Sequence, residues 1–246
     1  MPDCNLKRTA QRLVWGKLHN NGNACVAPDH VYVHEDIKDE LVEEIKKNIK
    51  KIAGSDPRKS PLLPRMVNEQ NFNRVMSLID PDKVVAGGSS DRSDLYIEPT
   101  VLDGVTQEDK IMQEEVFGPV LPILTFRDLN SVIETLKSQP APLALYIFTG
   151  NIHRAKKIML EVPSGGGMIN EVVMHFINMN AHFGGIGESG MGNYHGKAGF
   201  EAFSHYKTVM IKPTWFEIFL KYPPHYKINL RLYRSVLGRR IRNFWH

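Results

Sequence analysis

Short apolar strands alternate with amphipathic helices along this chain, and that alternation limits the folds it can adopt. Apolar residues recur at helical spacing over residues 5 to 19, and valines occupy alternate positions over residues 31 to 34. A second amphipathic helix begins near Asp36 and stops at Gly54. The same patterns predict helices near residues 67 to 79, 128 to 136 and 151 to 161. They also predict a short buried strand at residues 84 to 86 and strands at residues 96 to 102 and 143 to 148. Strands that alternate with helices predict an α/β domain with a largely parallel sheet.

The composition is that of a soluble globular protein in a reducing compartment. Of the 246 residues, 42% are hydrophobic and 24% are charged, as in soluble globular proteins. The length permits one large domain or two small ones. The two cysteines, Cys4 and Cys25, form neither a disulfide framework nor a paired metal-ligand motif, so no metal site is predicted. The sequence shows no signal-peptide pattern and no apolar run of about 18 residues. We therefore expect a cytoplasmic protein without a membrane span.

The carboxyl end of the chain is strongly basic. The net charge is +4, and residues 225–246 hold six cations and no acidic residue, so the rest of the chain is close to neutral. No nucleic-acid partner is expected, because no stripe of basic residues crosses the body. Apolar residues recur every three or four positions among the six cations, which predicts a helix in peripheral contact with an anionic membrane surface. The alternative is a helix packed on its own domain or on a partner.

A turn-rich loop after the first helix holds the candidate nucleophile. Cys25 follows Asn20, Asn21 and Gly22, residue types that let the backbone turn tightly and leave amide N–H groups near the thiol. Such surroundings favour the reactive thiolate. The alternative is a small buried cysteine kept for packing, and the local sequence places no base within reach of the sulfur.

Glu115 and Phe117 form a second candidate site, two positions apart and just before a Gly-Pro turn. On an extended backbone both side chains point to the same side. The carboxylate is then placed to accept hydrogen bonds from a sugar, and the ring to pack against a flat heterocycle. The alternative is a surface glutamate beside a core phenylalanine.

The stretch from residue 183 to residue 192 is rich in glycine. Gly185, Gly187 and Gly190 fit the Gly-x-Gly-x-x-Gly pattern of dinucleotide-binding loops. No clear strand precedes them, and no acidic residue follows at the expected distance, so we reject a dinucleotide site here. The glycines instead predict a loop that passes close to another backbone or to a ligand.

Taken together, four motifs resemble the aldehyde dehydrogenase superfamily in their order and approximate spacing. They are residues 22–29, residues 115–119, residues 164–166 with Asn170, and residues 183–192. Residues 194–197 and 203–205 resemble the class-three branch of that superfamily in particular. The resemblance covers about residues 4 to 212, and Tyr222-Pro223-Pro224 is similar to the carboxyl end of the same branch.

The resemblance implies a function and roles for three residues. Cys25 matches the catalytic nucleophile, and Glu115 and Phe117 match the contacts to the nicotinamide ribose of NAD or NADP. The implied reaction is the oxidation of an aldehyde to the acid through a cysteine thiohemiacetal and thioester, with apolar aliphatic or aromatic aldehydes as substrates. Helix amides or the backbone N–H of Cys25 supply one half of an oxyanion hole. The full-length form is expected to be a homodimer.

The sequence also departs from the family pattern. Asn23 stands where the family normally has Gln, and His182 where it usually has Pro. The chain starts just before the nucleophile helix, whereas the family carries a dinucleotide-binding domain, a deacylating glutamate and an oxyanion asparagine ahead of it. We therefore expect activity to require a longer chain. Two alternatives stay open: an inactive paralogue that acts as a binding or dimerisation module, and a thiol esterase with His175 or His182 as its base.

The expected domain organisation is a catalytic region followed by a tail. Residues 1–212 form the catalytic region, and residues 213–246 form an aromatic and basic tail that begins near Pro213. By the resemblance, residues 206–212 form a strand that pairs with the amino-terminal half or with a second subunit. The sequence does not distinguish NAD from NADP and does not identify the aldehyde.

Overall fold

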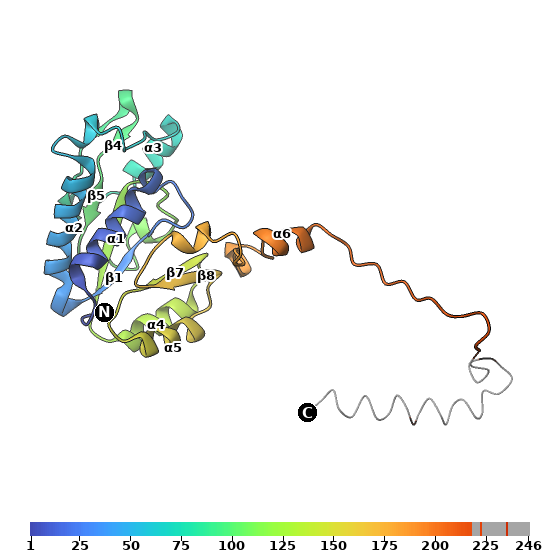
Figure 1. Cartoon of the computed structure of the whole chain (residues 1–246). Helices are drawn as coiled ribbons and strands as arrows, with labels where there is room; N and C mark the ends of the chain where they lie inside the picture. Colours follow the sequence, from blue (N-terminus) through green and yellow to red (C-terminus); the bar gives the residue numbers. More distant parts are fainter. Residues whose placement is uncertain (218–221, 223–234, 236–246) are drawn as a thin grey trace. The chain divides into compact units, whose positions relative to one another are not determined.

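The computed structural model describes residues 1–217, 222 and 235, which fall into two compact units, residues 1–204 and residues 205–246. The first unit is an α/β domain (Figure 1). Its helices are α1 (Leu6–Leu18), α2 (Lys38–Ala53), α3 (Glu69–Met76), α4 (Leu129–Ser138), α5 (Ile152–Glu161) and α6 (Gly196–Ala202). Its strands are β1 (Val31–His34), β2 (Val84–Ala86), β3 (Ser90–Asp91), β4 (Tyr96–Ile97), β5 (Thr100–Leu102), β6 (Val120–Phe126), β7 (Ala144–Ile147) and β8 (Gly166–Ile169).

The main sheet has the strand order β1-β6-β5-β2. Strands β1 and β5 both run parallel to the central strand β6, and β2 pairs antiparallel with β5 at the edge. A second sheet consists of the parallel strands β7 and β8, and β3 and β4 form a short antiparallel pair. The predicted α/β fold with a largely parallel sheet is confirmed.

Helices α1 and α2 cover one face of the main sheet (Figure 1). The apolar side of α1, including Ala10 and Val14, and that of α2, including Ile45, pack on Val33 and Ile123 of the sheet. Both helices were predicted from this spacing, since residues three and four apart share one face of a helix. On the other face, α3 packs with the segments that flank β5 and β6 in a second apolar cluster.

Helices α4 and α5 pack together beside β7 and β8 (Figure 1). The side chain of Asn151 accepts a hydrogen bond from the Arg154 N–H at the start of α5, and Asp128 caps α4 in the same way. The predicted Asn151 cap is therefore confirmed. Ala155 and Ile158 of α5 meet Ile147 of β7 and close this part of the core.

Three strands, β3, β6 and β8, were missed by the sequence analysis, and one was described wrongly. The central strand β6 contains Pro122, a residue that normally argues against a central strand because it cannot donate to the ladder. Here Pro122 ends the pairing with β5, and the pairing with β1 begins at the next residue. Strand β8 begins with glycines. Strand β2, expected to be buried, is half-exposed at the edge of the sheet.

Little of the carboxyl-terminal unit is described. Over residues 205–217 the structure assigns no strand, so the predicted strand at residues 206–212 stays a prediction. Lys212 pairs with Glu217, and the Tyr222 hydroxyl donates to Glu217 at 3.2 Å. The predicted basic helix lies outside the described residues apart from Ser235. Among the helices that are described, none is long and apolar enough to cross a membrane.

Candidate active site

The loop that carries Cys25 is turned by three consecutive residues in the left-handed conformation. Asn20, Asn21 and Gly22 have φ angles of 49°, 53° and 74° after the end of α1. The side-chain amides of Asn20 and Asn23 each donate to the other's backbone carbonyl, at 2.9 and 3.1 Å. This is the tight turn that the Asn-Asn-Gly sequence predicts. It leaves the side chain of Cys25 exposed, which excludes the alternative of a buried packing cysteine.

The Cys25 loop and the segment from Glu115 to Phe117 meet because they precede neighbouring parallel strands. The loop leads into β1 and the segment into β6, and these two strands pair directly. The amino ends of parallel strands lie at one edge of a sheet, so both candidate sites lie at the same edge. At this edge the backbones come very close: a Cβ atom at Gly22 would lie 2.2 Å from the Gly118 carbonyl oxygen.

A hydrogen bond joins the two segments directly. Asp29, four residues after Cys25, accepts a hydrogen bond from the Val116 N–H at 2.9 Å. From the other side, the Arg74 guanidinium of α3 donates to the Glu115 carbonyl at 3.1 Å and to the Val116 carbonyl at 2.8 Å. The backbone between Glu115 and Phe117 is therefore held from two directions.

The expected extended backbone at Glu115 and Phe117 is wrong. Phe117 has a φ of 43°, in the left-handed region that side chains other than glycine rarely adopt, and no strand covers these residues. The contacts of Val116 with Asp29 and Arg74 hold this conformation in place. The Phe117 side chain is 38% exposed, so it is not the core residue of the alternative interpretation.

A cleft brings Cys25 and Glu115 together. Both side chains line it, together with Asp29, His30, Tyr146 and Glu188. Phe117 is not among the lining residues, and neither His175 nor His182 is. His30, which the sequence analysis did not single out, lines the same cleft five positions after Cys25. Its Nδ1 atom lies 3.4 Å from Asp29.

Tyr146 of β7 fixes the backbone just after Cys25. Its hydroxyl donates to the Val26 carbonyl at 2.7 Å and accepts from the Val173 N–H at 3.1 Å. Burial raises the pKa of Tyr146 to about 12. The phenol thus stays protonated over the physiological range and remains a hydrogen-bond donor to the loop.

Three charged groups share the region between the loop and the segment. Lys17 of α1 is 3% exposed, and burial lowers its pKa to about 8, although the carboxylates of Asp29 and Glu115 act in the opposite direction. Burial alone would raise the pKa of Asp29, but the hydrogen bond with His30 and the charge of Lys17 outweigh it, and the pKa lies below its usual value. Burial and the charge of Asp29 raise the pKa of Glu115.

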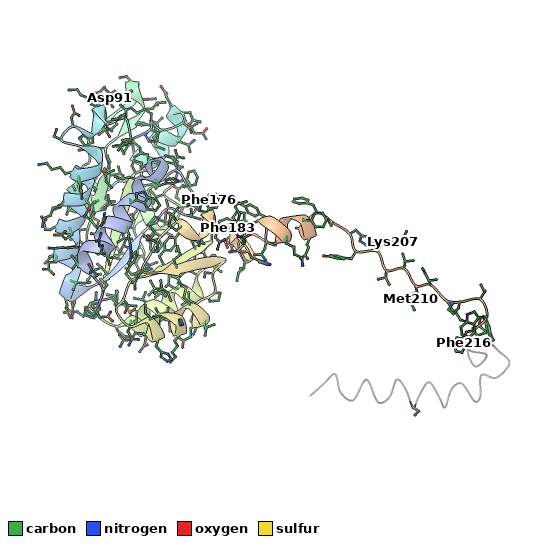
Figure 2. The ribbon with its side chains drawn as sticks, in the orientation of Figure 1. Asp91, Phe176, Phe183, Lys207, Met210 and Phe216 are labelled. Atoms are coloured by element: carbon green, nitrogen blue, oxygen red, sulfur yellow. The ribbon has the colours of Figure 1, made fainter. Side chains whose placement is uncertain are left out.

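The glycine-rich stretch is a close-packed loop. No strand leads into it and no α-helix starts within it, which agrees with the rejection of a dinucleotide site. A Cβ atom at Gly185 would lie 2.0 Å from the Ser189 carbonyl oxygen, so this loop folds tightly on itself. At the start of the stretch, the ring of Phe183 packs against that of Phe176, with the ring centroids 5.3 Å apart in a T-shaped arrangement (Figure 2).

No group of three or more metal-ligating side chains gathers anywhere in the described part of the chain. The cleft instead offers a thiol, carboxylates and an imidazole, which are groups for nucleophilic and proton-transfer chemistry.

The fold has close counterparts among solved structures. The substrate-bound state of Staphylococcus aureus AldH superimposes with a TM-score of 0.90 at 39% identity, over 96% of this chain and 52% of that one. The Mycobacterium tuberculosis aldehyde dehydrogenase complexed with NAD+ gives a TM-score of 0.76 at 25% identity, over 89% of this chain and 46% of that one.

The sequence profile of the aldehyde dehydrogenase family matches residues 1–209, and the chain belongs to this family. It is 42% identical over 223 residues to the 4,4'-diaponeurosporen-aldehyde dehydrogenase of Staphylococcus aureus, which covers 90% of this chain and 49% of that protein. It is likewise 42% identical over 224 residues to the dimeric NADP-preferring aldehyde dehydrogenase of Canis lupus familiaris, covering 90% of this chain and 49% of that protein.

The resemblance to the class-three branch is confirmed by a further relative. Aldehyde dehydrogenase family 3 member H1 of Arabidopsis thaliana is 39% identical over 244 residues, which is 97% of this chain and 50% of that protein. The chain thus spans about half the length of these curated relatives.

We predict that Gly22→Ala destabilises the protein far more than Gly104→Ala. Both glycines have similar positive φ angles, 74° and 69°, so a side chain at either position costs about 1 kcal/mol of backbone strain. Around Gly104 the space is open, whereas at Gly22 the new Cβ meets the Gly118 carbonyl oxygen. The clash should add about 2 kcal/mol or more to the loss in the free energy of unfolding, measured in urea. Equal losses for the two variants would show that the loops do not meet as described.

We also predict a pH dependence of stability that comes from Lys17. Its pKa falls from 10.5 in the unfolded chain to about 8 in the folded protein, so the unfolded chain binds more protons between these values. The penalty for burying the ammonium is fully present below about pH 8 and is relieved as the pH rises toward 10. The free energy of unfolding of the wild type, relative to Lys17→Met, should rise over this window by on the order of 3 kcal/mol.

The matched control for this measurement is Lys156→Met on α5, where the lysine is exposed. Its difference from the wild type should stay flat over the same pH range. A flat difference for Lys17→Met as well would contradict the prediction.

Proposed function

We propose that this chain is the catalytic portion of an NAD(P)-dependent aldehyde dehydrogenase that oxidises aldehydes to carboxylic acids. The observation that carries the proposal is the exposed thiol of Cys25, which shares a cleft with Glu115 and is tied through Asp29 to the segment that bears Phe117. Cys25 is the nucleophile in this proposal, and Glu115 and Phe117 are the cofactor contacts. The assignment rests on family membership and on this arrangement of the three residues.

The residues present fit the nicotinamide end of NAD or NADP. Glu115 offers a carboxylate at the cleft that can accept hydrogen bonds from ribose hydroxyls. Phe117 presents a partly exposed ring that can pack against a flat heterocycle. One relative is described as NADP-preferring and one structural counterpart is complexed with NAD+, which supports both cofactors. When bound, the oxidised nicotinamide supplies a hydride acceptor.

The reaction centres on the Cys25 sulfur. The thiolate attacks the aldehyde carbon to give a thiohemiacetal, whose oxyanion is stabilised by the backbone N–H of Cys25. Departure of a hydride from that carbon leaves a thioester on Cys25. Water then cleaves the thioester, which releases the acid and restores the thiol. In the family the deacylating glutamate and the oxyanion asparagine lie ahead of the nucleophile helix, and we propose that they complete the reaction in the full-length form.

The proposal extends to substrate, assembly and domains. Apolar aliphatic or aromatic aldehydes are the proposed substrates, by the resemblance to the class-three branch. We propose residues 1–212 as the catalytic region and residues 213–246 as the tail, with residues 206–212 pairing in a homodimer of the full-length form. The name of the dimeric canine relative supports this assembly.

Two alternatives remain distinct from this proposal. An inactive paralogue would keep the fold and act as a binding or dimerisation module without turnover. A thiol esterase with His175 or His182 as its base would need that histidine at the thiol, but neither lines the cleft. The ring nitrogens of His175 are buried without a hydrogen-bond partner, and burial lowers its pKa. These features favour an apolar packing role for His175.

The test of the nucleophile is acylation by p-nitrophenyl acetate followed by peptide mass spectrometry. We expect the acetyl group on Cys25 and not on Cys4, because Cys25 is the exposed thiol of the cleft. In the full-length form, Cys25→Ser should lower NAD-dependent aldehyde oxidation by about a thousandfold or more, since the nucleophile is lost. Cys4→Ser is the control and should keep the activity. Oxidation that survives Cys25→Ser would overturn the mechanism, whereas a full-length form that is acylated at Cys25 but does not oxidise aldehydes would favour the binding module.

For the tail, we propose peripheral contact with an anionic membrane surface through residues 225–246. The argument is the sequence pattern of six cations among regularly spaced apolar residues. Replacing Arg239, Arg240 and Arg242 with glutamine should weaken co-sedimentation with phosphatidylserine vesicles by about a hundredfold, because each cation near such a surface contributes about 1 kcal/mol.

The matched control replaces three exposed cations of α5, namely Arg154, Lys156 and Lys157, with glutamine. This control should bind the vesicles as the wild type does. If the binding of the wild type to the vesicles does not depend on their phosphatidylserine content, the membrane role of the tail is excluded.

A further inference from the structure

Asp29 connects the two parts of the candidate site. Its backbone belongs to the Cys25 loop, and its Oδ1 atom accepts the Val116 N–H at 2.9 Å from a segment 87 residues away in sequence. We propose that Asp29 is a positioning residue that sets Glu115 and Phe117 relative to Cys25. The inference rests on the proposed function, because it gives these three residues their roles.

The peptide unit between Glu115 and Val116 is held at both of its polar groups. Its N–H donates to Asp29, and its carbonyl accepts from Arg74 at 3.1 Å. Arg74 also holds the next carbonyl, that of Val116, at 2.8 Å. A peptide plane bonded on both sides has little freedom to rotate, so the direction in which Glu115 leaves the backbone is set by these partners.

The strained conformation of Phe117 depends on the same contacts. A φ of 43° in a bulky residue is unfavourable, and it persists only where the surroundings determine the backbone on either side. Asp29 and Arg74 determine it before Phe117, and the close approach of Gly118 to Gly22 determines it afterwards. Without Asp29, the segment loses its direct bond to the Cys25 loop and can relax toward a common conformation.

The position of Asp29 is itself well determined. Pro28 lies against α1, where a Cβ atom at Gly16 would be 3.1 Å from its ring. Val26 is buried, and its carbonyl accepts from Tyr146. The short connection from Cys25 to Asp29 is thus fixed at two points, so a displacement of one end is transmitted to the other.

The charges around Asp29 support the arrangement. Lys17 lies on one side of the carboxylate, and His30 lies 3.4 Å from its Oδ2 atom. Glu115 carries a negative charge near that of Asp29, and Arg74 donates to the backbone carbonyl of Glu115. The His30 ring, the charge of Lys17 and the Val116 N–H keep the Asp29 carboxylate ionised, and an ionised acceptor makes the stronger hydrogen bond to a backbone N–H.

Hydrogen exchange of the whole chain measures this bond directly. In Asp29→Ala, exchange at the Val116 amide should speed up by about tenfold or more, because the amide loses a charged acceptor. Asp29→Asn keeps a side-chain oxygen and should restore most of the protection. Asp128→Ala, which removes an aspartate cap from α4, is the matched control and should leave residues 114–118 unchanged.

A second measurement connects the bond to the cofactor contact. Nicotinamide mononucleotide should slow the alkylation of Cys25 by iodoacetamide in the wild type and in Asp29→Asn, while Cys4 serves as the internal reference. In Asp29→Ala this protection should fall by about tenfold, since Glu115 is no longer held in the cleft with the thiol and Phe117 loses its fixed backbone.

The two measurements separate the possible failures. If Asp29→Ala exchanges at Val116 as the wild type does, the positioning role is overturned whatever the alkylation result. A general loss of stability would raise exchange throughout the domain and would also overturn it, because the proposal requires a change confined to residues 114–118. If the wild type shows no protection by nicotinamide mononucleotide, the proposed cofactor contact fails in this chain, and the exchange data still decide the role of Asp29.

Discussion

The parallel pairing of β1 with β6 is the constraint on which the candidate site depends. Each strand is preceded by one part of the site: the Cys25 loop enters β1, and the segment of Glu115 and Phe117 enters β6. Because the strands run in the same direction, both segments lie at the amino edge of the sheet. The starting residues of β7 line the same cleft. A single register between Val31 and Ile123 therefore brings together residues that are far apart in sequence.

Close backbone contacts turn this proximity into a defined geometry. Gly22 approaches the carbonyl of Gly118, and Asp29 accepts the N–H of Val116. Contacts of this kind need a residue without a Cβ atom, or a short side chain that carries a hydrogen-bond acceptor. They allow the two backbones little movement relative to each other. The buried Lys17 adds a charge that the nearby carboxylates compensate in part. The site is thus built from ordinary elements that are held close by a few specific residues.

Local patterns were a good guide to the elements whose signals are contained in one short stretch. The periodicity of α1 and α2, the Asn151 cap and the Asn-Asn-Gly turn all depend on neighbours in sequence, and all appear as predicted. Strand β6 was missed because it contains Pro122, which a central strand tolerates here only because the pairing with β5 ends at that residue and the pairing with β1 begins at the next. The backbone at Phe117 was misjudged, since its φ angle is set by Asp29 and Arg74, neither of which is near it in sequence.

By itself, the sequence determined the α/β class, the helices α1 to α5, the tight turn before Cys25 and the membership in the aldehyde dehydrogenase family. These follow from periodicity, turn chemistry and ordered motifs, which require no knowledge of what each residue touches. Only the tertiary structure decided that Cys25 and Glu115 share a cleft, that His30 faces it, and that Asp29 joins the two segments. Those relations depend on which strands become neighbours and in which register, and pairing over long sequence separations leaves no local pattern.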